Sequence, residues 1–563
     1  MLNICYNLIR FENFNERDDI MSKIKIFGLG GLDENGKNTY VVEVDDRIFI
    51  LDAGLKYAND SNFGIDYIIP DYSYFKRNSK KIVGVFITHA HPESFGGVSD
   101  LVKMLPHIKI YGTKYTINQL KLDGISESNL ITIAPHKKLN FGNVSVFPIN
   151  VNHSVPGSVM YVLNTPDGAV VYTGDFIIDP SMMGDYHMDL GKIAYVGKQG
   201  VLALLCESSF SENIGHTSPN HHMVSFFKNI INKASGRIIF STLPVHLYTI
   251  EGIFNAARNS HRKIVVMGKK LQNIINMAIS EGYIDGNGLL GDLSNVNDNN
   301  AIILICDDRA KPYNAIEKII AGADRYIKLN NTDTVCFAEP KYDENEKTLV
   351  KIQNELAIMG INEIGMPKDK GISLHASSED IMIMLDLLKP KYFMPVKAEY
   401  RFMVGAADLA SDLGYSADNI ILKQNGDVIN IVDKKLIDNK EHIFIDDVLI
   451  DGSSSEDVGD LVIKDRQMLS ENGIVLVSAT LSKKDKHIIV GPEIVTRGFI
   501  YVKDSKELIE EIKRISAEVI LKNTSNNYVD FNSIKTEIRE KLSKFFYVET
   551  ECNPMIIAVI QEV

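Results

Sequence analysis

Histidine and acidic residues stand directly after apolar, strand-like segments in the first third of the chain. His89 and His91 follow VGVFIT, His153 follows NVSVFPINVN, and Asp175 follows AVVYTG. Alternate histidines on one loop can point two imidazoles at the same ion, and three imidazoles with one carboxylate suit Zn²⁺ or Mn²⁺. Each residue alone is better explained as a hydrogen-bonded side chain near a core. The four together, in this order, favour a metal centre.

Other candidate residues would lie next to such a centre without binding the ion. Asp52, at the end of FILDAG, could accept a hydrogen bond that fixes the tautomer of a metal-binding histidine. Ser377 and Asp380 fit a helix-capping box. His375 and Ser377, just before that helix, could hold a phosphate on its N-terminal backbone N–H groups, and simple capping is the alternative. His216, His221 and His222 are interpreted as loop or surface histidines.

The pattern of elements that must position these residues changes twice along the chain. From Lys23 to Asp175 short strands and turns dominate, and the candidate metal ligands stand at strand ends. Between about Ser208 and Pro367 helices and strands alternate, which predicts a doubly wound α/β module. Residues 371–432 then predict helix, strand and helix. A polar segment, DKKLIDNKEH, reads as a linker before a last compact α/β unit.

Composition limits the classes of protein that remain. The 563 residues predict three or four domains. The net charge of −13 would repel a polyanion unless basic residues gather in a groove. Five scattered cysteines indicate a reducing cytoplasm. We expect a soluble protein without a membrane span or signal peptide, because no apolar run is long enough. Residues 1–21 are expected to be a disordered extension, or to precede a true start at Met21.

One glycine motif is misleading. GLGG, at residues 28–31, follows a strand, and Asp52 lies near the distance that a dinucleotide-binding fingerprint requires. The segment after it reads as a β-hairpin, so no helix N-terminus is available for a pyrophosphate. This interpretation is therefore rejected.

With these motifs in place, the chain resembles the metallo-β-lactamase hydrolases of the β-CASP group, and specifically the bacterial ribonuclease J family. The similarity runs from about Lys23 to Val563. Its segments include GLGGLDENGKNTYVVE, ILDAGLKY, FITHAH, VNHSVPGSV, TGDF, GVLALLCESS, LLKPKYFMPV, EYR, GPEIVTRGFIYV and PMIIAVIQEV. Several of them lie away from any active site.

The resemblance implies a metallo-β-lactamase αββα sandwich, an inserted doubly wound β-CASP domain and a small α/β C-terminal domain that helps dimerisation. The implied boundaries are 22–207 and 371–432 for the sandwich, 208–370 for the insertion, 433–446 for a linker and 447–563 for the last domain. The resemblance further implies that RNA threads between the first two domains and that two metal ions cut it, 5′ to 3′ or internally. By position, His375, Glu207 and Glu93 would be catalytic, with His375 assisting the leaving oxygen.

The sequence departs from the family pattern mainly at the second ion. The motif H-x-H-x-D-H ends here in Glu93 and Ser94, and a later histidine ligand is replaced by Lys397. We therefore expect one divalent ion, Zn²⁺ or Mn²⁺, and loss of the second site, because two-metal hydrolysis clamps the phosphate between both ions. Lys397 would fill the vacated position and pair with Glu93 or Asp175, the alternative being that it extends to solvent.

Other departures affect RNA contacts. Pro244, Val245 and His246 stand where the family has an Ala-Ser-Asn segment that contacts RNA, Glu207 replaces an aspartate, and Leu374 replaces a glycine. Ser377 and His246 remain the candidates for RNA phosphate contacts.

The sequence thus predicts an RNA-binding protein that is weak or inactive alone and acts as a homodimer or in a heteromer with an intact ribonuclease J paralogue. The alternative is an active metal-dependent 5′–3′ exoribonuclease or endoribonuclease. A small-molecule hydrolase such as a thioesterase is disfavoured, since it would not need the α/β insertion.

Overall fold

The computed structural model describes residues 22–58, 64–216, 223–306, 313–338, 345–367, 375–437, 440–452, 454–457, 460–499, 506–524 and 529–563. Their contacts divide the chain into two compact units. The first runs to Tyr57 and from Tyr67 to Val448, and the second contains Ala58–Asp66 and Leu449–Val563. The predictions for residues 1–21, His221, His222 and Leu374 fall outside the described residues.

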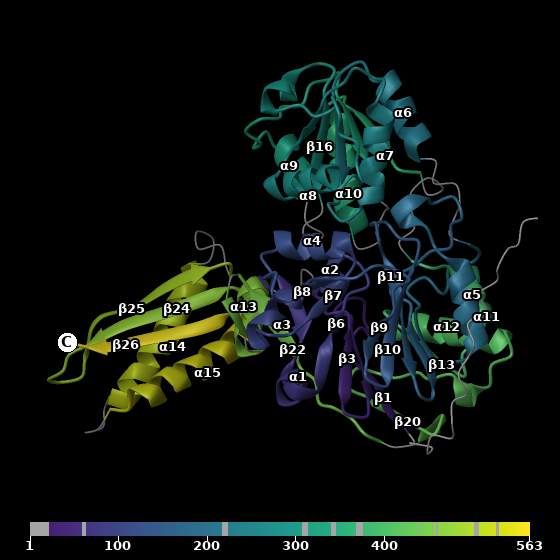
Figure 1. Ribbon diagram of the computed structural model, residues 1–563. Helices are drawn as coiled ribbons and strands as arrows, with labels where there is room; N and C mark the ends of the chain where they lie inside the picture. Colours follow the sequence, from purple (N-terminus) through teal and green to yellow (C-terminus); the bar gives the residue numbers. More distant parts are fainter. Residues whose placement is uncertain are drawn as a thin grey trace, which may run out of the picture. The chain divides into compact units, whose positions relative to one another are not determined.

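Two β-sheets form the frame of the first unit (Figure 1). The larger has eight strands in the order β21 (Lys435–Ile437), β20 (Ile429–Val432), β1 (Lys23–Gly30), β2 (Thr39–Val44), β3 (Arg47–Leu51), β6 (Ile82–Phe86), β7 (Ile110–Gly112) and β8 (Leu130–Thr132). Strand β6 is parallel to both of its neighbours, β3 and β7. Parallel strands are usually buried on both faces, which explains why VGVF is apolar throughout instead of alternating.

The second sheet has six strands: β19 (Tyr392–Val396), β13 (Val201–Glu207), β12 (Gly168–Tyr172), β11 (Val159–Thr165), β10 (Val144–Asn150) and β9 (Leu139–Phe141). Side chains from the facing sides of the two sheets, such as Phe49, Phe86, Tyr161 and Val170, form one apolar core. The sandwich expected from the resemblance is therefore present.

Helices cover the sandwich. A second core joins the outer face of the six-stranded sheet to α5 (Leu190–Gln199), α11 (Ser378–Leu388) and α12 (Tyr400–Asp412). Helix α4 (Lys114–Leu122) packs on β7 and β8. The remaining short elements of this part are β4 (Lys56–Tyr57), β5 (Tyr67–Pro70), α1 (Ser73–Arg77), α2 (Pro92–Phe95), α3 (Val98–Met104) and the 3₁₀ turns Ser79–Lys81, Gly184–Tyr186 and Ala417–Asn419.

The inserted module contains a five-stranded, wholly parallel sheet in the order β15 (Ile264–Val266), β16 (Ile302–Cys306), β14 (Ile238–Thr242), β17 (Thr334–Phe337) and β18 (Asn362–Gly365). Its helices are α6 (Met223–Lys233), α7 (Leu247–Ala257), α8 (Lys269–Ser280), α9 (Asn314–Ile320) and α10 (Glu346–Ile358), with a 3₁₀ turn at Leu293–Asn297. The alternation read from the sequence is confirmed as a doubly wound fold.

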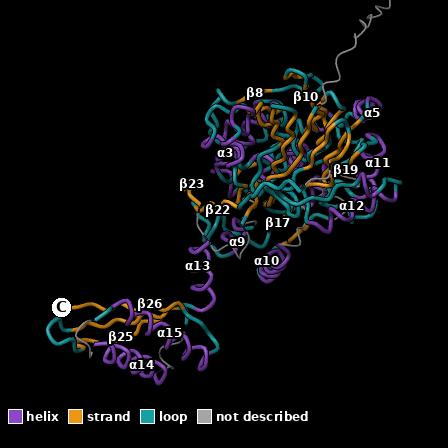
Figure 2. Tube along the Cα trace, turned by 90° about the horizontal axis from the view of Figure 1, so that it is seen from below, coloured by secondary structure: helices purple, strands orange, loops and turns teal. Residues whose placement is uncertain are grey.

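The second unit pairs a sheet with two long helices (Figure 2). The strands lie in the order β25 (Ile488–Arg497), β24 (Ile474–Leu481) and β26 (Met555–Glu562). Alternate residues of β24 pack with α14 (Lys506–Thr524) and α15 (Phe531–Thr550) in one apolar core. Strands β22 (Asp447–Asp451) and β23 (Ser454–Asp457) pair with each other, and α13 (Asp460–Asn472) precedes β24.

The segment 433–446, expected to be a linker, begins with a structured portion. Lys435–Ile437 forms the edge strand β21, and all three of its side chains are exposed. Charged, exposed residues are usual at sheet edges, where they discourage further pairing. Among the described residues no helix is long and apolar enough to cross a membrane.

Candidate metal centre and its surroundings

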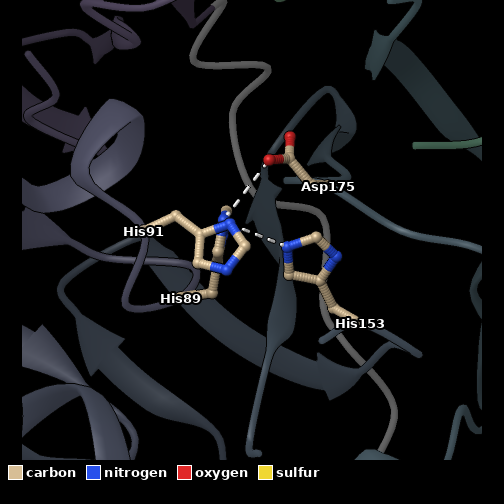
Figure 3. A group of neighbouring side chains, drawn as sticks. All are labelled: His89, His91, His153 and Asp175. Atoms are coloured by element: carbon tan, nitrogen blue, oxygen red, sulfur yellow. Dashed lines mark hydrogen bonds and ion pairs between the residues drawn. The ribbon is translucent and has the colours of Figure 1, made fainter. Parts of the chain in front are cut away.

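Four of the predicted ligands converge on one point of the sandwich. His89 and His91 lie on the loop between β6 and α2, His153 lies between β10 and β11, and Asp175 follows β12. All four are buried, and one ligand atom from each lies within 4.8 Å of the others (Figure 3). The loops bring them together because parallel and antiparallel strands of both sheets end at the same edge.

The spacing of the ligand atoms fits one tetrahedral ion. His153 Nε2 lies 3.2 Å from His91 Nδ1, and His89 Nε2 lies 3.3 Å from Asp175 Oδ2. Ligand atoms 2.0–2.1 Å from a tetrahedral ion are separated by about 3.3 Å. The buried His89 Nε2 makes no hydrogen bond within the described part of the chain. These four residues would hold a divalent ion such as Zn²⁺ or Mn²⁺.

Hydrogen bonds fix which nitrogen of His91 faces the centre. Its Nε2 lies 3.2 Å from the backbone carbonyl of Val245 and 3.0 Å from Ser154 Oγ. A carbonyl oxygen can only accept, so His91 Nε2 carries the proton and donates it. The lone pair of Nδ1 is thereby left for an ion, as is usual when a second contact orients a metal-binding histidine.

Asp52 acts on His89 through Thr88 instead of touching it. Its carboxylate accepts from Thr88 N at 2.7 Å, from Thr88 Oγ1 at 2.9 Å and from Tyr172 Oη at 2.7 Å. Thr88 Oγ1, having donated to Asp52, accepts from His89 Nδ1 at 2.9 Å. The proton on Nδ1 leaves Nε2 as the ligand atom of His89. Burial raises the pKa of Asp52, despite the opposing charge of Lys397.

The charge states around the centre suit metal binding. Burial lowers the pKa of His91 and of His153 well below the usual histidine range, so both imidazoles are neutral. Burial acts to raise the pKa of Asp175, but Lys397 and His89 outweigh it and hold that pKa well below its usual range. A neutral imidazole and an ionised carboxylate are the forms that bind metal ions.

Lys397 turns into the centre and not toward solvent. Its Nζ lies 2.5 Å from Asp175 Oδ1, 3.9 Å from Asp52 Oδ2 and 3.3 Å from Ser94 Oγ. The side chain is only 2% exposed. Burial lowers the pKa of Lys397, but the charges of Asp175 and Asp52 outweigh it, so the net pKa is raised and the ammonium stays charged. Of the two partners considered from the sequence, Asp175 is the one paired with it.

Glu93 and Ser94 begin the turn of α2 beside this ammonium. Glu93 Oε1 lies 3.8 Å from His91 Nδ1. Backbone hydrogen bonds tie the segment to the DAG loop, since Ala53 N donates to Ser94 O at 2.8 Å. Gly54 allows this approach, because a Cβ there would lie 1.7 Å from the Glu93 carbonyl oxygen. The loop therefore fixes the backbone at both positions where this chain differs from the family motif.

A second pair lies beside the centre at the end of β13. His375 Nδ1 lies 2.7 Å from Glu207 Oε2, and Glu207 Oε1 accepts from the backbone of Phe176 at 2.5 Å. Burial raises the pKa of Glu207. Burial lowers the pKa of His375, but Glu207 outweighs it and the net pKa is raised. Ligand atoms of Glu207, His375 and Asp175 lie within 4.8 Å of one another, so the pair borders the candidate centre.

The two predicted phosphate-binding residues lie on different elements. Ser377 caps α11 in a box with Asp380, and its backbone N–H donates to Asp380 Oδ2 at 3.1 Å. His246 precedes α7, with its ring centroid 6.1 Å from that of His91. His216, expected to be a solvated loop residue, lies 2.7 Å from Glu379 Oε2 and 3.2 Å from Asp380 Oδ1, so it pairs with the first turn of α11.

Three side-chain contacts of the centre were not anticipated from the sequence. Thr88 and Ser154 bind the two histidines, and each is the immediate neighbour of a ligand in the sequence, in THAH and NHS. Tyr40 Oη accepts from Lys397 N at 3.0 Å, a contact across more than 350 positions that has no local signal.

A two-sheet sandwich with a His–Asp cluster at its strand ends and an inserted α/β module defines a metal-dependent hydrolase of the metallo-β-lactamase superfamily, β-CASP type. Family models agree by region. They match the metallo-beta-lactamase superfamily at 32–195, the ribonuclease J beta-CASP domain at 235–356, the Zn-dependent metallo-hydrolase RNA specificity domain at 368–421 and the ribonuclease J C-terminal domain at 461–563.

Curated relatives narrow the assignment. The chain is 34% identical to ribonuclease J 2 of Staphylococcus aureus strain MRSA252, covering 96% of this chain and 98% of that protein. It is 33% identical, with the same coverage, to ribonuclease J 2 of Staphylococcus epidermidis. A solved structure of a protein of unknown function from Enterococcus faecalis aligns at 15% identity and a TM-score of 0.49 over 73% of this chain. The chain belongs to the ribonuclease J family of RNA-processing hydrolases.

Proposed function

We propose that this protein binds RNA through a ribonuclease J fold whose centre holds one metal ion, and that it has little or no phosphodiesterase activity alone. It acts, in this proposal, in the cytoplasm as the RNA-binding subunit of a complex with an intact ribonuclease J. The observation that carries the proposal is the buried ion pair between Lys397 and Asp175, at 2.5 Å.

The ion pair argues against a second metal ion for two reasons. A protonated lysine has donors only and cannot coordinate a cation. The two ions of such hydrolases lie about 3.5–4 Å apart, and a divalent ion at that distance from the first would meet the ammonium that already contacts Asp175. Ser94 Oγ accepts a hydrogen bond from Lys397 Nζ at 3.3 Å, where the family motif has a histidine ligand.

The residues that match the family pattern would bind the first ion and orient the RNA. His89, His91, His153 and Asp175 would hold the ion, which supplies Lewis acidity toward a phosphate oxygen when bound. His375, paired with Glu207 at 2.7 Å, would give a proton to a departing oxygen. Without a second cation to clamp the phosphate, this set supports slow hydrolysis at most.

The RNA contacts in this proposal come from both parts of the first unit. Ser377 at the start of α11 and His246 at the start of α7 would contact phosphates. Ser377 lies within residues 368–421, which match an RNA specificity domain, and His246 lies within the region that matches the beta-CASP domain. Assembly with another ribonuclease J, or with a second copy, would use the second unit, whose residues 461–563 match the family's C-terminal domain.

Metal content tests the centre directly. Purified protein loaded with Mn²⁺ and desalted is expected to carry one ion per chain by mass spectrometry, and His89→Ala none. The triple variant Glu93→Asp, Ser94→His, Lys397→His is expected to carry two. Two ions in the unaltered chain, or no gain in the triple variant, would contradict the one-ion centre.

Activity separates the proposal from its alternative, an active exoribonuclease or endoribonuclease. A 5′-monophosphorylated oligoribonucleotide with Mn²⁺ is expected to be bound, with cutting near background. Rapid cutting that His89→Ala abolishes would show that this chain is the enzyme. Purification from native cells at low salt is expected to recover a second ribonuclease J together with this protein. If the second protein is lost when the preparation is treated with RNase, the two do not form a heteromer and the proposal of one is wrong.

A further inference from the structure

A small cavity lies in the first unit next to the loop that carries His91. It has a volume of about 160 Å³ and draws its walls from both the sandwich and the inserted module. Leu55, Phe95, Leu243 and Ile274 supply apolar walls, and all four are buried. The part-buried Tyr57 adds an aromatic ring to the lining.

The cavity and the candidate metal centre share a wall. Ala90 and Pro92, the neighbours of His91 in the chain, line it, and so does Val245. The Val245 carbonyl is one of the two groups that His91 Nε2 contacts, at 3.2 Å, the other being Ser154 Oγ. A group inside the cavity would therefore be separated from the ion by little more than the His91 ring and its backbone.

The size of the cavity restricts what can fill it. Sites that enclose a drug-sized molecule have volumes of about 300–1,000 Å³. An apolar cavity of about 150 Å³ holds one six-membered aromatic ring. The cavity thus has room for one six-membered ring, such as that of a pyrimidine base, and less room for the two fused rings of a purine base.

One positive and one negative side chain lie at the cavity, and the positive one can serve a nucleic acid strand. Lys270, exposed at the start of α8, lines it together with Asp123. Burial raises the pKa of Asp123, and the nearby Lys270 charge partly opposes that rise. A lysine next to a base-sized apolar cavity can pair with the phosphate attached to that base.

We propose that this cavity takes a single pyrimidine base of a bound RNA strand, stacked on Phe95 or Tyr57, with Lys270 on its phosphate. The inference rests on the proposed RNA binding and adds a base preference to it. Stacking on aromatic side chains is the usual way in which proteins hold unpaired bases.

Binding of homopolymers provides the first test. Fluorescence anisotropy with EDTA present, so that no strand is cut, compares a uridine dodecamer with an adenosine dodecamer on the full-length protein. We expect about tenfold tighter binding of the uridine strand, the free energy of roughly one stacked base. Ile274→Phe, which fills the cavity, should bring the two affinities together.

Two lysine substitutions, one at the cavity and one beside it, provide the control. Lys270→Ala should weaken binding of the uridine strand about threefold or more, whereas Lys269→Ala, the preceding exposed lysine that does not line the cavity, should change it less. Equal losses from both variants would mean general attraction and would overturn the assignment of Lys270.

Crosslinking keeps the test independent of any variant's folding. A uridine dodecamer containing 4-thiouridine, irradiated on the unaltered protein, is expected to label the peptide with Phe95 or that with Tyr57. Labels only elsewhere, or no uridine preference in a strand that binds, would overturn the cavity assignment alone. Failure of both strands to bind would overturn the proposed RNA binding as well.

Discussion

Lys397 Nζ lies 2.5 Å from Oδ1 of Asp175, while Oδ2 of the same carboxylate faces His89 Nε2 at 3.3 Å. The buried carboxylate of Asp175 therefore contacts the ammonium of a lysine side chain with one oxygen and a candidate metal-binding histidine with the other. The chain neutralises Asp175 with its own ammonium, so the centre keeps a counter-charge whether or not a metal ion is bound.

Replacing Lys397 by Met should destabilise the metal-free protein by about 3–5 kcal/mol, because Asp175 would stay buried without its partner. Thermal unfolding in EDTA measures the loss. Saturating Mn²⁺ should recover part of it, since an ion can then neutralise the carboxylate.

Lys347→Ala, an exposed lysine of α10, is the matched control and should change the unfolding temperature little. If Lys397→Met is as stable as the unaltered chain in EDTA, the ion pair does not hold the centre together.

The positions of His89, His153 and Asp175 at strand ends could be predicted because apolar runs stop just before them. The capping box of Ser377 and Asp380 could also be predicted, since it depends on the spacing of two residues near each other in the sequence. Both patterns are local in the sequence, so they can be recognised without knowledge of the tertiary fold.

The sequence left Glu93 and Asp175 open as partners of Lys397, because a long side chain selects among carboxylates that only the assembled sheets bring close. The contact between Val245 and His91 could not be predicted because it is made by a backbone carbonyl, which every residue has. The short strand β21 within the predicted linker 433–446 could not be recognised, since exposed edge residues such as Lys435 are as polar as linker residues.

The inserted module should depend on a buried ion pair. Arg237 Nε and Nη2 bind the two carboxylate oxygens of Asp333 at 2.9 and 2.6 Å, and Nη2 also donates to the Lys328 carbonyl at 2.6 Å. Arg237→Lys should cost about 2–4 kcal/mol, because an ammonium cannot reproduce the two-pronged contact. Local hydrogen exchange in β14 and β17 measures it.

Arg262, at the edge of the same module and less buried, offers the control, and Arg262→Lys should have the smaller effect. Equal protection of β14 in the unaltered chain and in Arg237→Lys would contradict a role for the paired geometry.

The helices of the second unit should loosen in acid through Glu537. Hydrogen bonds from Lys522 and Asn523 lower the pKa of Glu537 to about 2. A carboxyl group with a lowered folded-state pKa stabilises above its unfolded value, near 4.5, and the effect is lost as the pH falls toward 2. The group lies at the surface, so the contribution is a fraction of 1 kcal/mol and falls with salt.

Hydrogen exchange of α14 and α15 at pH 5 and pH 3 measures this loss. Glu537→Gln should show raised exchange already at pH 5, and Glu540→Gln, on the same helix, should not. The same pH response in Glu537→Gln as in the unaltered chain would assign the acid sensitivity to other groups.

Asp52→Asn should weaken metal binding about 10–100-fold, the usual effect of removing the partner that orients a ligand. Asp52 adopts a left-handed backbone with φ of 61°, which asparagine tolerates, so the substitution tests the hydrogen bonds and not the backbone. The amide nitrogen cannot accept the hydrogens that Thr88 Oγ1 and Tyr172 Oη now give to the carboxylate, so Thr88 would be held less firmly against His89 Nδ1, which it contacts at 2.9 Å. Competition against a fluorescent chelator measures the affinity for Zn²⁺, with Asp46→Asn, 93% exposed, as the control. An unchanged affinity in Asp52→Asn would mean that the ring of His89 is oriented by packing alone.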